Sequence, residues 1–464
     1  MPSWPLKTWV WISVALGFLR FIWLRDVTLV NDDQLLLHLA LKGNASGEWV
    51  QWGLRGTRGV DYGPFAIWIY QVLLKVAHDP FWLVSAKIVL CTAGTVVGVT
   101  SLLGTFAFLP RWVGVVPMLS PYLWVYARDL WDNSFLIPVT ACLAAAHFRF
   151  LFAPTFLKFF SVALACTLAV LTHLMAAPIV AGTAAHLLWR HWRWVLKHAV
   201  QVTLTLLFLA FLAWPYFAHL RELNVGGAFL GPKIGAFVFA FMGARQFTAA
   251  ASEYFFGWAW FWQFGAPWNG IVTAGVGLSV LALLASFRGM ARAVKAALAK
   301  GQRPEKELGI WISAVLFLFV VNATLTQIVS HPHYYNAVWT VFFLCAAWGA
   351  TGGNWSRKLA PFYLAGLAIS LVGAASLVHI NGGNRELRYG MTLGEQWKAG
   401  AELACYPDKV QFYDERERSF WESVWLMRSW QACSGTPRTD AKVRLRYRDP
   451  ANPWDAHAVV EPKD

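Results

Sequence analysis

Residues 30–43 read VNDDQLLLHLALKG and follow the first apolar run of the chain, Trp9–Leu24. That run is long enough to cross a bilayer, so the quoted stretch is the first segment to leave it. Two adjacent carboxylates, Asp32 and Asp33, open a short apolar helix there, and Gly43 is placed to end it. The stretch predicts a membrane-embedded chain with an acidic helix start at the membrane surface.

The composition of the whole chain supports a membrane protein. Of 464 residues, 57% are hydrophobic and 14% are charged, whereas about 25% are charged in an ordinary globular domain. No small-residue cleavage site follows the first apolar run, so we expect a retained span rather than a signal peptide. We expect about eleven spans, each of about 20 apolar residues, over Trp9–Leu24, Phe81–Leu109, Trp112–Ala127, Phe135–Phe152, Phe159–Leu171, Met175–Trp189, Ala199–Leu220, Ile271–Phe287, Ile310–Ile328, Ala337–Ala350 and Pro361–Val378.

The distribution of charge predicts the orientation of these spans. A net charge of +14 would by itself also fit a nucleic-acid-binding protein. The basic residues instead gather in short connections between apolar runs, which is typical of cytoplasmic loops, so we expect a bilayer and no nucleic acid as partner. With those loops inside, the segments expected outside are residues 25–80, 128–133, 222–269, 330–336 and everything after 379.

Two segments differ from the spanning pattern. Phe65–Val76 is apolar but short, so we expect a helix lying in the interface. If it crossed the bilayer instead, the number of spans would no longer place all the basic loops on the cytoplasmic side, unless another pair of spans were merged into one. The tail is polar and mixes a helical stretch, Leu393–Leu403, with strand-like stretches. We therefore expect a membrane module over residues 1–380 and a small extramembrane α/β domain over 381–464.

The six cysteines divide between the two parts. Cys405 and Cys433 lie in the polar tail, and a disulfide between them is expected if the tail is outside the cytoplasm. The alternative is two unpaired thiols. The other four lie inside apolar runs, where they are expected to be core thiols: Cys91, Cys142, Cys166 and Cys345.

The acidic pair has a structural explanation and a functional one. Asn31 or Asp32 can cap the helix that begins there, and Asp33 can complement the helix dipole. Ionisable groups at a membrane face also mark functional sites. Three other stretches that are expected to face outward also contain ionisable residues: RDLWDN (128–133), LTHLMAAP (171–178) and SHPHYYN (330–336).

Together these stretches supply carboxylates and cations at one membrane surface. A carboxylate there can take a proton from a hydroxyl or amine, and cationic groups can stabilise a phosphate leaving group as its charge develops. Such a site suits a donor that is a lipid phosphate ester. His331 and His333 also suggest zinc, but no third ligand is close in sequence, so zinc is the weaker interpretation.

The same stretches resemble the polytopic glycosyltransferases of the GT-C superfamily, in the branch that includes protein mannosyltransferases and the lipid A aminoarabinose transferase. The resemblance covers about residues 1–350 and departs from the family at His173, where relatives often carry lysine. The stretches that carry it are NDDQLLLHLALKG (31–43), DYGPFAIWIYQVLLKV (61–76), ARDLWDNSFL (127–136) and HPHYYN (331–336).

The resemblance implies an all-α polytopic GT-C fold in a bacterial inner membrane, with its site and tail on the periplasmic side. It implies an inverting transfer from a polyprenyl-phosphate sugar. Mapped onto this chain, Asp32 is the general base, and Asp33 and Asp132 orient substrate. Some relatives depend on a divalent cation (Mg, Mn or Ca) and others do not, so the metal stays open; Asp32 and Asp132 would hold it.

The resemblance also implies cations at the donor phosphate. Arg128 and His333 are expected there first, because their motifs match. Further candidates are Arg245, His331, Arg58, Tyr334, Arg55 and Lys233, while Asp61, Tyr62 and His173 are expected to position substrate. For Arg55 and Arg58 the alternative is solvated loop charge.

Residues 228–268 add a lipid argument. This outer loop is rich in aromatic residues and glycine but is interrupted by Arg245 and Glu253, so we expect it to lie along the interface. It could cover a polyprenyl tail while Arg245 meets the phosphate. The alternative is an aromatic belt without a ligand.

Two other classes of function compete with the transferase. A transporter or lipid flippase would place ionisable residues near the bilayer midplane and often shows internal repeats, neither of which the sequence indicates. The second class is a scaffold protein without catalytic activity, and the acidic pair argues against it. The sequence names neither the sugar nor the acceptor, which could be a glycan, a lipid or a protein.

Overall fold

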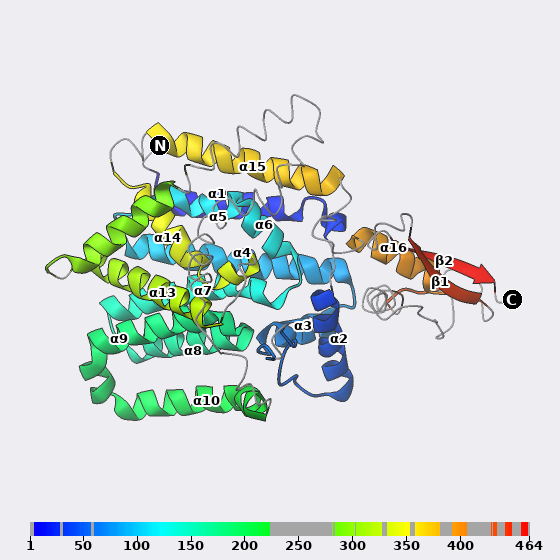
Figure 1. Cartoon of the computed structure of the whole chain (residues 1–464), viewed down its shortest axis with the longest axis horizontal. Coiled ribbons are helices and arrows are strands. Elements are labelled where there is room, and N and C mark those ends of the chain that lie inside the picture. Colours follow the sequence, from blue (N-terminus) through cyan, green and yellow to red (C-terminus); the bar gives the residue numbers. More distant parts are fainter. Residues whose placement is uncertain are drawn as a thin grey trace.

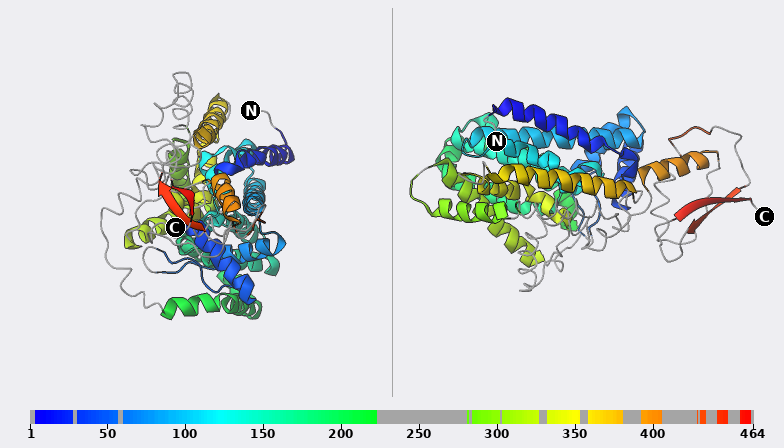
Figure 2. Two further views of the ribbon diagram at one scale, coloured as in Figure 1. Left: turned by 90° about the vertical axis from the view of Figure 1, so that its right-hand side faces the viewer. Right: turned by 90° about the horizontal axis from the view of Figure 1, so that it is seen from above.

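The structure is a computed structural model. It describes residues 4–27, 31–56, 60–222, 281, 284–301, 303–326, 332–352, 358–380, 392–405, 428, 430–433, 441–447 and 456–462. The described part is mostly helical. Long helices run side by side along one direction (Figure 1), and the view from above shows the same alignment for α1, α4 and α15 (Figure 2). These helices are α1 (Leu6–Gly17), α4 (Pro80–Thr105), α7 (Leu136–Phe152), α8 (Phe156–Thr172), α9 (Ala177–Lys197), α10 (Ala199–Glu222), α13 (Pro304–Thr326), α14 (Trp339–Gly349) and α15 (Ala360–Ile380).

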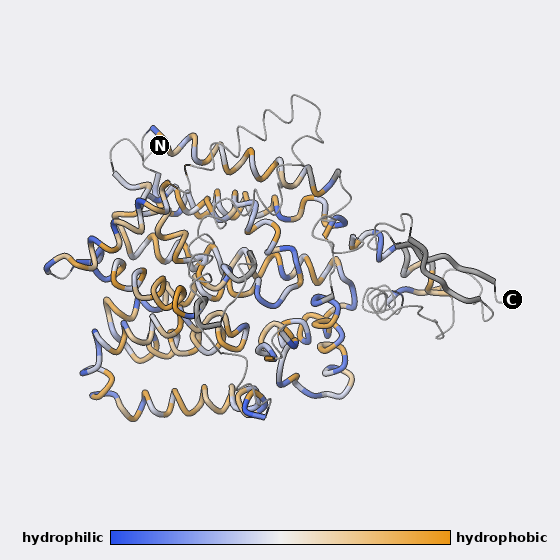
Figure 3. The backbone as a smooth tube through the Cα atoms, viewed as in Figure 1, coloured by the Kyte–Doolittle hydropathy of each residue, from blue (hydrophilic) through white to orange (hydrophobic). Residues whose placement is uncertain are grey.

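Three stretches are long and apolar enough to cross a membrane, among the residues that the structure describes. They are Pro80–Thr105, Asp132–Phe152 and Ala199–Glu222. Shorter apolar helices accompany them. Hydrophobic residues recur along most of the length of the helices in the bundle (Figure 3). The chain is a multi-pass membrane protein, while the exact number of spans and the division at residue 380 stay predictions.

Small residues bring the central helices close together. A Cβ added at Gly98 of α4 would lie 2.6 Å from the backbone of Ala141 in α7, and one at Gly94 would lie 2.7 Å from Pro138. Such close backbone approach is how helices associate where lipid is the solvent. α7 in turn packs against α8, so α7 lies between α4 and α8.

The apolar run 112–127 is not the single helix that the sequence suggested. It is divided into a 3₁₀ turn η3 (Arg111–Val115), a short α5 (Val116–Leu119) and α6 (Pro121–Arg128). Pro117 and Pro121 each stand at the start of one piece, because proline cannot continue a preceding turn but fits the first turn of a new helix. The first span is also shorter than expected, since α1 gives way to η1 (Phe18–Phe21) and η2 (Leu24–Asp26).

Two helices close one end of the bundle, called here the α2 end. α2 (Asn31–Ser46) runs across the bundle rather than along it, with α3 (Phe65–Val76) beside it (Figure 1). The prediction that Gly43 ends α2 is wrong: the helix continues to Ser46, and Gly47, at φ +72°, follows it. Gly43 allows close packing instead, because an added Cβ would lie 2.5 Å from Nε2 of Gln71.

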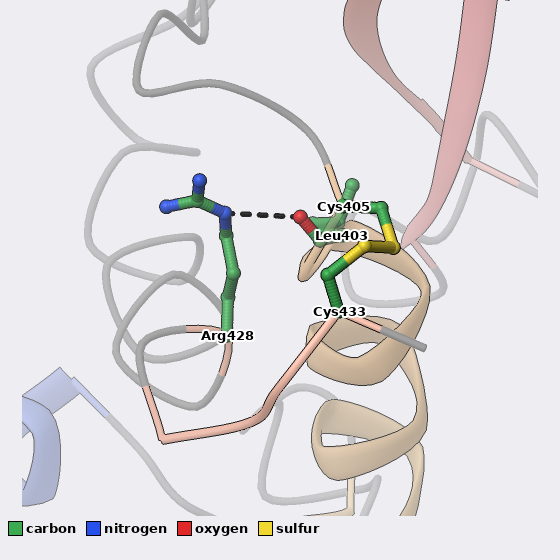
Figure 4. Close-up of a disulfide and its surroundings, with 4 residues drawn as sticks. All are labelled: Leu403, Cys405, Arg428 and Cys433. Carbon is green, nitrogen blue, oxygen red and sulfur yellow. Dashed lines mark hydrogen bonds between the residues drawn. A yellow bond between two sulfur atoms is a disulfide. The ribbon is translucent and has the colours of Figure 1, made fainter. Parts of the chain in front are cut away.

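The tail returns to the α2 end. α16 (Leu393–Leu403) starts with a capping box between Thr392 and Glu395, and the Leu393 amide donates to the Val27 carbonyl at 2.6 Å. Cys405 and Cys433 form a disulfide beside the end of this helix (Figure 4). Two antiparallel strands follow, β1 (Ala441–Tyr447) and β2 (Ala456–Pro462). That these elements form one α/β domain stays a prediction.

Candidate active site

Asp32 lies at the start of α2 with its side chain open to solvent. One carboxylate oxygen, Oδ2, accepts a hydrogen bond of 3.0 Å from the Trp131 indole nitrogen. Partial desolvation by the surrounding chain raises the pKa of Asp32, and the bond from Trp131 opposes that rise. Two of the predicted stretches, VNDDQLLLHLALKG and RDLWDN, therefore meet at this carboxylate.

Asp33 points the other way, into the protein, and is fully buried. It lies within electrostatic range of Lys87 on α4, which is also fully buried. The Lys87 ammonium donates to the Tyr126 carbonyl at 2.9 Å and lies 5.6 Å from the centre of the Phe135 ring. A buried ammonium is stable only with such compensation.

Lys87 lies among carboxylates from two segments, α2 and the loop after α6. Besides Asp33, it is attracted to Asp129 and Asp132, and Asp132 in turn interacts electrostatically with Asp32. We call Asp32, Asp33, Asp129 and Asp132 the acidic corner. The Tyr70 hydroxyl of α3 donates to the Leu130 carbonyl at 2.6 Å, which fixes the loop that carries two of these residues.

The two carboxylate oxygens of Asp132 differ in their hydrogen bonding. Oδ1 accepts from the Asn133 amide at 2.6 Å. Oδ2 is buried and has no hydrogen-bond partner among the described residues. A buried carboxylate oxygen in that state is unfavourable unless something binds it. Asp132 is therefore the member of the corner best placed to receive a ligand hydroxyl or a cation.

The predicted hairpin 330–336 reaches the same place through its last residue. Asn336 donates from Nδ2 to Asn133 Oδ1 at 3.1 Å and accepts at Oδ1 from the Tyr122 hydroxyl at 2.5 Å. All three side chains are buried. His331 lies outside the described residues, and so do the side chains of His333 and Tyr334, so their expected contact with a phosphate stays a prediction.

Arg128 is buried at the edge of the corner. Its Nη2 donates to the Trp23 carbonyl at 2.5 Å, and its guanidinium lies 3.9 Å from the centre of the Trp124 ring. Nη1 is buried with no hydrogen-bond partner in the part of the chain that is described. Burial lowers the pKa of Arg128 to about 10, so the group stays charged at pH 7.

A second polar group lies at the same end, around Asp61. Asp61 Oδ2 pairs with His219 Nε2 of α10 at 2.5 Å, and the Tyr216 hydroxyl donates to the Asp61 carbonyl at 3.0 Å. Oδ1 of Asp61 is buried and unpartnered within the described residues. Tyr216 is within electrostatic range of both Asp61 and Asp132, so this group adjoins the acidic corner.

Tyr62 and His173 pack against each other beside this group. Their ring centres are 3.9 Å apart. His173 Nδ1 accepts from the Met175 amide at 3.1 Å, and burial lowers the pKa of His173 to about 3. His173 is therefore neutral at pH 7 and does not supply the positive charge of the lysine that relatives carry there. Its expected part in positioning substrate is untested.

The remaining candidates are Arg55 and three residues that the structure does not describe. Arg55 is exposed and bridges Asp61 only through its backbone. Arg58, Lys233 and Arg245 lie outside the described residues, as does the loop 228–268. Over the described ranges, no group of three or more His, Cys, Asp or Glu side chains is arranged to hold a metal ion. A cation held by Asp32 and Asp132 stays a prediction.

Comparison with known proteins identifies the fold. No protein-family profile matches the chain, and no curated protein does. The crystal structure of ArnT from Cupriavidus metallidurans bound to undecaprenyl phosphate matches over 98% of both chains, with 14% identity and a TM-score of 0.52. The chain has the fold of ArnT. The apo structure of the same ArnT has 17% identity and a TM-score of 0.48, covering 86% of this chain and 79% of ArnT.

The resemblance that the short stretches suggested is confirmed at the level of the fold. The alignment with ArnT covers 98% of this chain. At this identity, ArnT does not assign roles to individual side chains.

Two buried cations were not predicted from the sequence. Lys87 lies inside the apolar run 81–109, and Arg20 lies inside the first run. Arg20 donates to Thr92 Oγ1 at 2.8 Å and to the Pro117 carbonyl at 3.1 Å, which ties η1 to α4 and α5. The available signal was their position, since a charged residue within a span is unfavourable and usually functional.

Proposed function

We propose that this protein is a membrane glycosyltransferase that takes its sugar from a polyprenyl-phosphate donor, with Asp32 as general base. The observation that carries the proposal is the acidic corner at one end of an ArnT-fold bundle. There, one carboxylate is solvent-accessible and oriented by Trp131. ArnT was crystallised with undecaprenyl phosphate, and we extend that class of lipid to this chain.

The proposed reaction is a single displacement with inversion. An acceptor hydroxyl or amine attacks the anomeric carbon of the sugar, and Asp32 takes the proton from the attacking atom. The bond between the anomeric carbon and the phosphate oxygen breaks, and its electron pair leaves with polyprenyl phosphate. Solvent access at Asp32 gives the acceptor a path to the base.

Positive charge at the acidic corner supports the leaving group. Lys87 lies within electrostatic range of Asp33, Asp129 and Asp132, and Arg128 lies within range of Asp129. Cations stabilise the charge that develops on phosphate. Arg128 retains a buried nitrogen without a partner in the described chain, so it can still donate a hydrogen bond. We assign His333 and Arg245 to the same task as predictions.

Asp61 and Asp132 are assigned to orient the sugar or the acceptor. Each has a buried carboxylate oxygen with no partner among the residues described, and sugar hydroxyls are suitable donors for such oxygens. If a divalent cation takes part, Asp32 and Asp132 are the residues we expect to hold it. We place this end of the bundle at the outer face of the bacterial inner membrane, from the positive-inside pattern.

One observation favours a second candidate, a transporter for a lipid-linked sugar. A buried polar chain connects α7, α9 and α13: His147 Nε2 and His186 Nδ1 are 3.0 Å apart, and His186 Nε2 is 3.1 Å from Glu307 Oε2. Transporters place ionisable groups inside the membrane. The transfer assay below separates this candidate from the transferase.

The test uses purified protein in detergent, with polyprenyl-phosphate sugars extracted from host membranes and crude envelope as acceptor. Mass spectrometry follows the release of free polyprenyl phosphate. Wild type should release it, and Asp32→Asn should not. The matched control is Asp79→Asn at the same end: Asp79 caps α4 by accepting from Trp82, and asparagine caps equally well. Release by Asp32→Asn at the wild-type rate would remove Asp32 from the base role.

A further inference from the structure

A cavity opens at the end of the bundle opposite the acidic corner, called here the far end. Its volume is about 1250 Å³, and its walls come from α1, α4, α7 and α8. The start of α1 meets the end of α4 there, since a Cβ added at Gly104 would lie 3.7 Å from Leu6. The end of α7 is beside them, with the rings of Phe106 and Phe152 6.0 Å apart.

The walls of the cavity are mostly apolar and face the membrane. Trp11 of α1, Val97 of α4 and Leu157 of α8 are 62–73% exposed, although they belong to apolar helices. Such exposure is normal where hydrocarbon chains, rather than water, cover the side chains. Acyl chains therefore suit the walls.

Three cations stand where the helices end. Lys7 is in the first turn of α1, Arg149 in the last turn of α7, and Lys158 in the first turn of α8, and all three line the cavity. The Lys158 ammonium donates to the Ala153 carbonyl at 2.8 Å, which keeps it at the turn between α7 and α8. None of the described residues that line the cavity is acidic.

One further polar atom belongs to a residue that lines the cavity. Ser101 Oγ of α4 is buried and has no hydrogen-bond partner within the described chain. A hydroxyl can donate to an ester carbonyl, which lies between the headgroup and the acyl chains of a phospholipid. The cavity thus combines cations at the helix ends, a hydroxyl and apolar walls.

We propose that this cavity is a binding site for an anionic phospholipid of the surrounding bilayer, with its phosphate at Lys7, Arg149 and Lys158. The charge of the rim selects an anionic headgroup over a neutral one, and basic pockets between membrane helices bind such headgroups. The volume is larger than the usual 300–1,000 Å³ of a small-molecule pocket and accommodates a headgroup with the upper part of its chains. The site is separate from the acidic corner and does not depend on the proposed transferase activity.

The first experiment measures lipid selectivity. Purified protein is placed in nanodiscs of equal phosphatidylglycerol and phosphatidylcholine, extracted in mild detergent, and analysed by native mass spectrometry for retained lipid. Wild type should retain phosphatidylglycerol preferentially. The triple variant Lys7→Gln, Arg149→Gln, Lys158→Gln should lose that preference, by about fivefold for each cation removed.

A control variant removes the same charge elsewhere. Arg193, Lys197 and Lys300 are exposed and do not line the cavity, so changing all three to Gln should leave the preference unchanged. Equal loss in both variants would show that total charge, rather than this cavity, selects the lipid, and would overturn the proposal. Wild type without any preference would overturn it as well.

The second experiment needs no variant and so does not depend on folding of the triple mutant. Phosphatidylglycerol with a photoreactive headgroup is incorporated into the nanodiscs, crosslinked, and mapped by peptide mass spectrometry. Labels should concentrate on residues 6–11, 100–105 and 149–161, and excess unlabelled phosphatidylglycerol should compete. Labels spread evenly over all lipid-facing helices would identify a general lipid annulus and contradict the proposal.

Discussion

The Trp131 indole donates a hydrogen bond of 3.0 Å to Asp32, across 99 positions of sequence. The bond attaches the start of α2 to the loop before η4 (Asp132–Phe135). It also stabilises the ionised form of Asp32, because a hydrogen bond donated to a carboxylate favours its charge. One side chain thus controls both the position and the proton affinity of the proposed base.

Trp131→Phe should slow transfer by about tenfold or more, because a hydrogen bond to a charged group contributes about 1.5–3 kcal/mol. The variant should also raise the pKa of Asp32. A base acts only when deprotonated, so the acidic limb of the pH–rate profile should move to higher pH. The control is Trp68→Phe, which loses an indole bond to the Val50 carbonyl. An acidic limb that stays in place in Trp131→Phe would contradict the prediction.

Lys87→Met should destabilise the protein by about 3–5 kcal/mol, because it leaves three carboxylates without their buried cation. The measurement is the thermal unfolding midpoint in detergent. Adding Asp129→Asn to the variant should recover part of the loss, since one of those charges is then removed. Lys75→Met is the matched control: Lys75 is exposed on α3 above the Trp49 ring, and its loss should change stability by less than about 1 kcal/mol. Equal effects of the two lysine variants would refute the electrostatic role of Lys87.

Asn336→Ala should lower both stability and transfer. It removes the acceptor of the Tyr122 hydroxyl and the donor to Asn133 in a buried site, and each group left without its partner costs about 1–3 kcal/mol. Transfer should fall further than stability explains, because Asn133 adjoins Asp132. Asn44→Ala, which loses one partly buried bond to the Gln71 carbonyl, should reduce stability alone. If the folded Asn336→Ala variant transferred sugar at the normal rate, the hairpin would have no part in the proposed site.

Alkylation should distinguish the free thiols of the chain from the two cysteines of the disulfide. Under denaturing conditions without reductant, four cysteines should react, and six should react after reduction, because Cys405 and Cys433 are joined. Changing both to Ser should destabilise the tail by about 3 kcal/mol in the chain-entropy account. Six labels without reductant, from protein isolated under oxidising conditions, would contradict the disulfide.

Hydrophobic patterning predicted much of the bundle from sequence. α4 begins and ends within a few residues of the expected run, as do α7, α8 and α10, because apolar length alone specifies a span. The break at 112–127 was also present in the sequence as Pro117 and Pro121. It was missed because hydropathy averaged over a window takes no account of backbone donors that proline lacks.

Part of the geometry of the candidate site was predicted from the sequence. Asp33 and Asp132 were singled out from their residue types, and both lie within electrostatic range of Lys87, while the roles of the candidate residues stay predictions. Pairings such as Asp61 with His219, 158 residues apart, depend on how helices pack, which spacing within one segment does not encode. Lys87 was overlooked because only loop residues were considered as cations.

The contact between the tail and the first turns of the chain has a consequence for biosynthesis. The Leu393 amide binds the Val27 carbonyl, and His379 stacks on Trp23 while pairing with Asp26. Trp23 is also the residue whose carbonyl holds Arg128. The ribosome delivers these partners at opposite ends of translation, so the surroundings of Arg128 are completed only when nearly all of the chain has been made. A nascent chain that has already inserted its first helices therefore remains without a finished site until its C-terminal segment arrives.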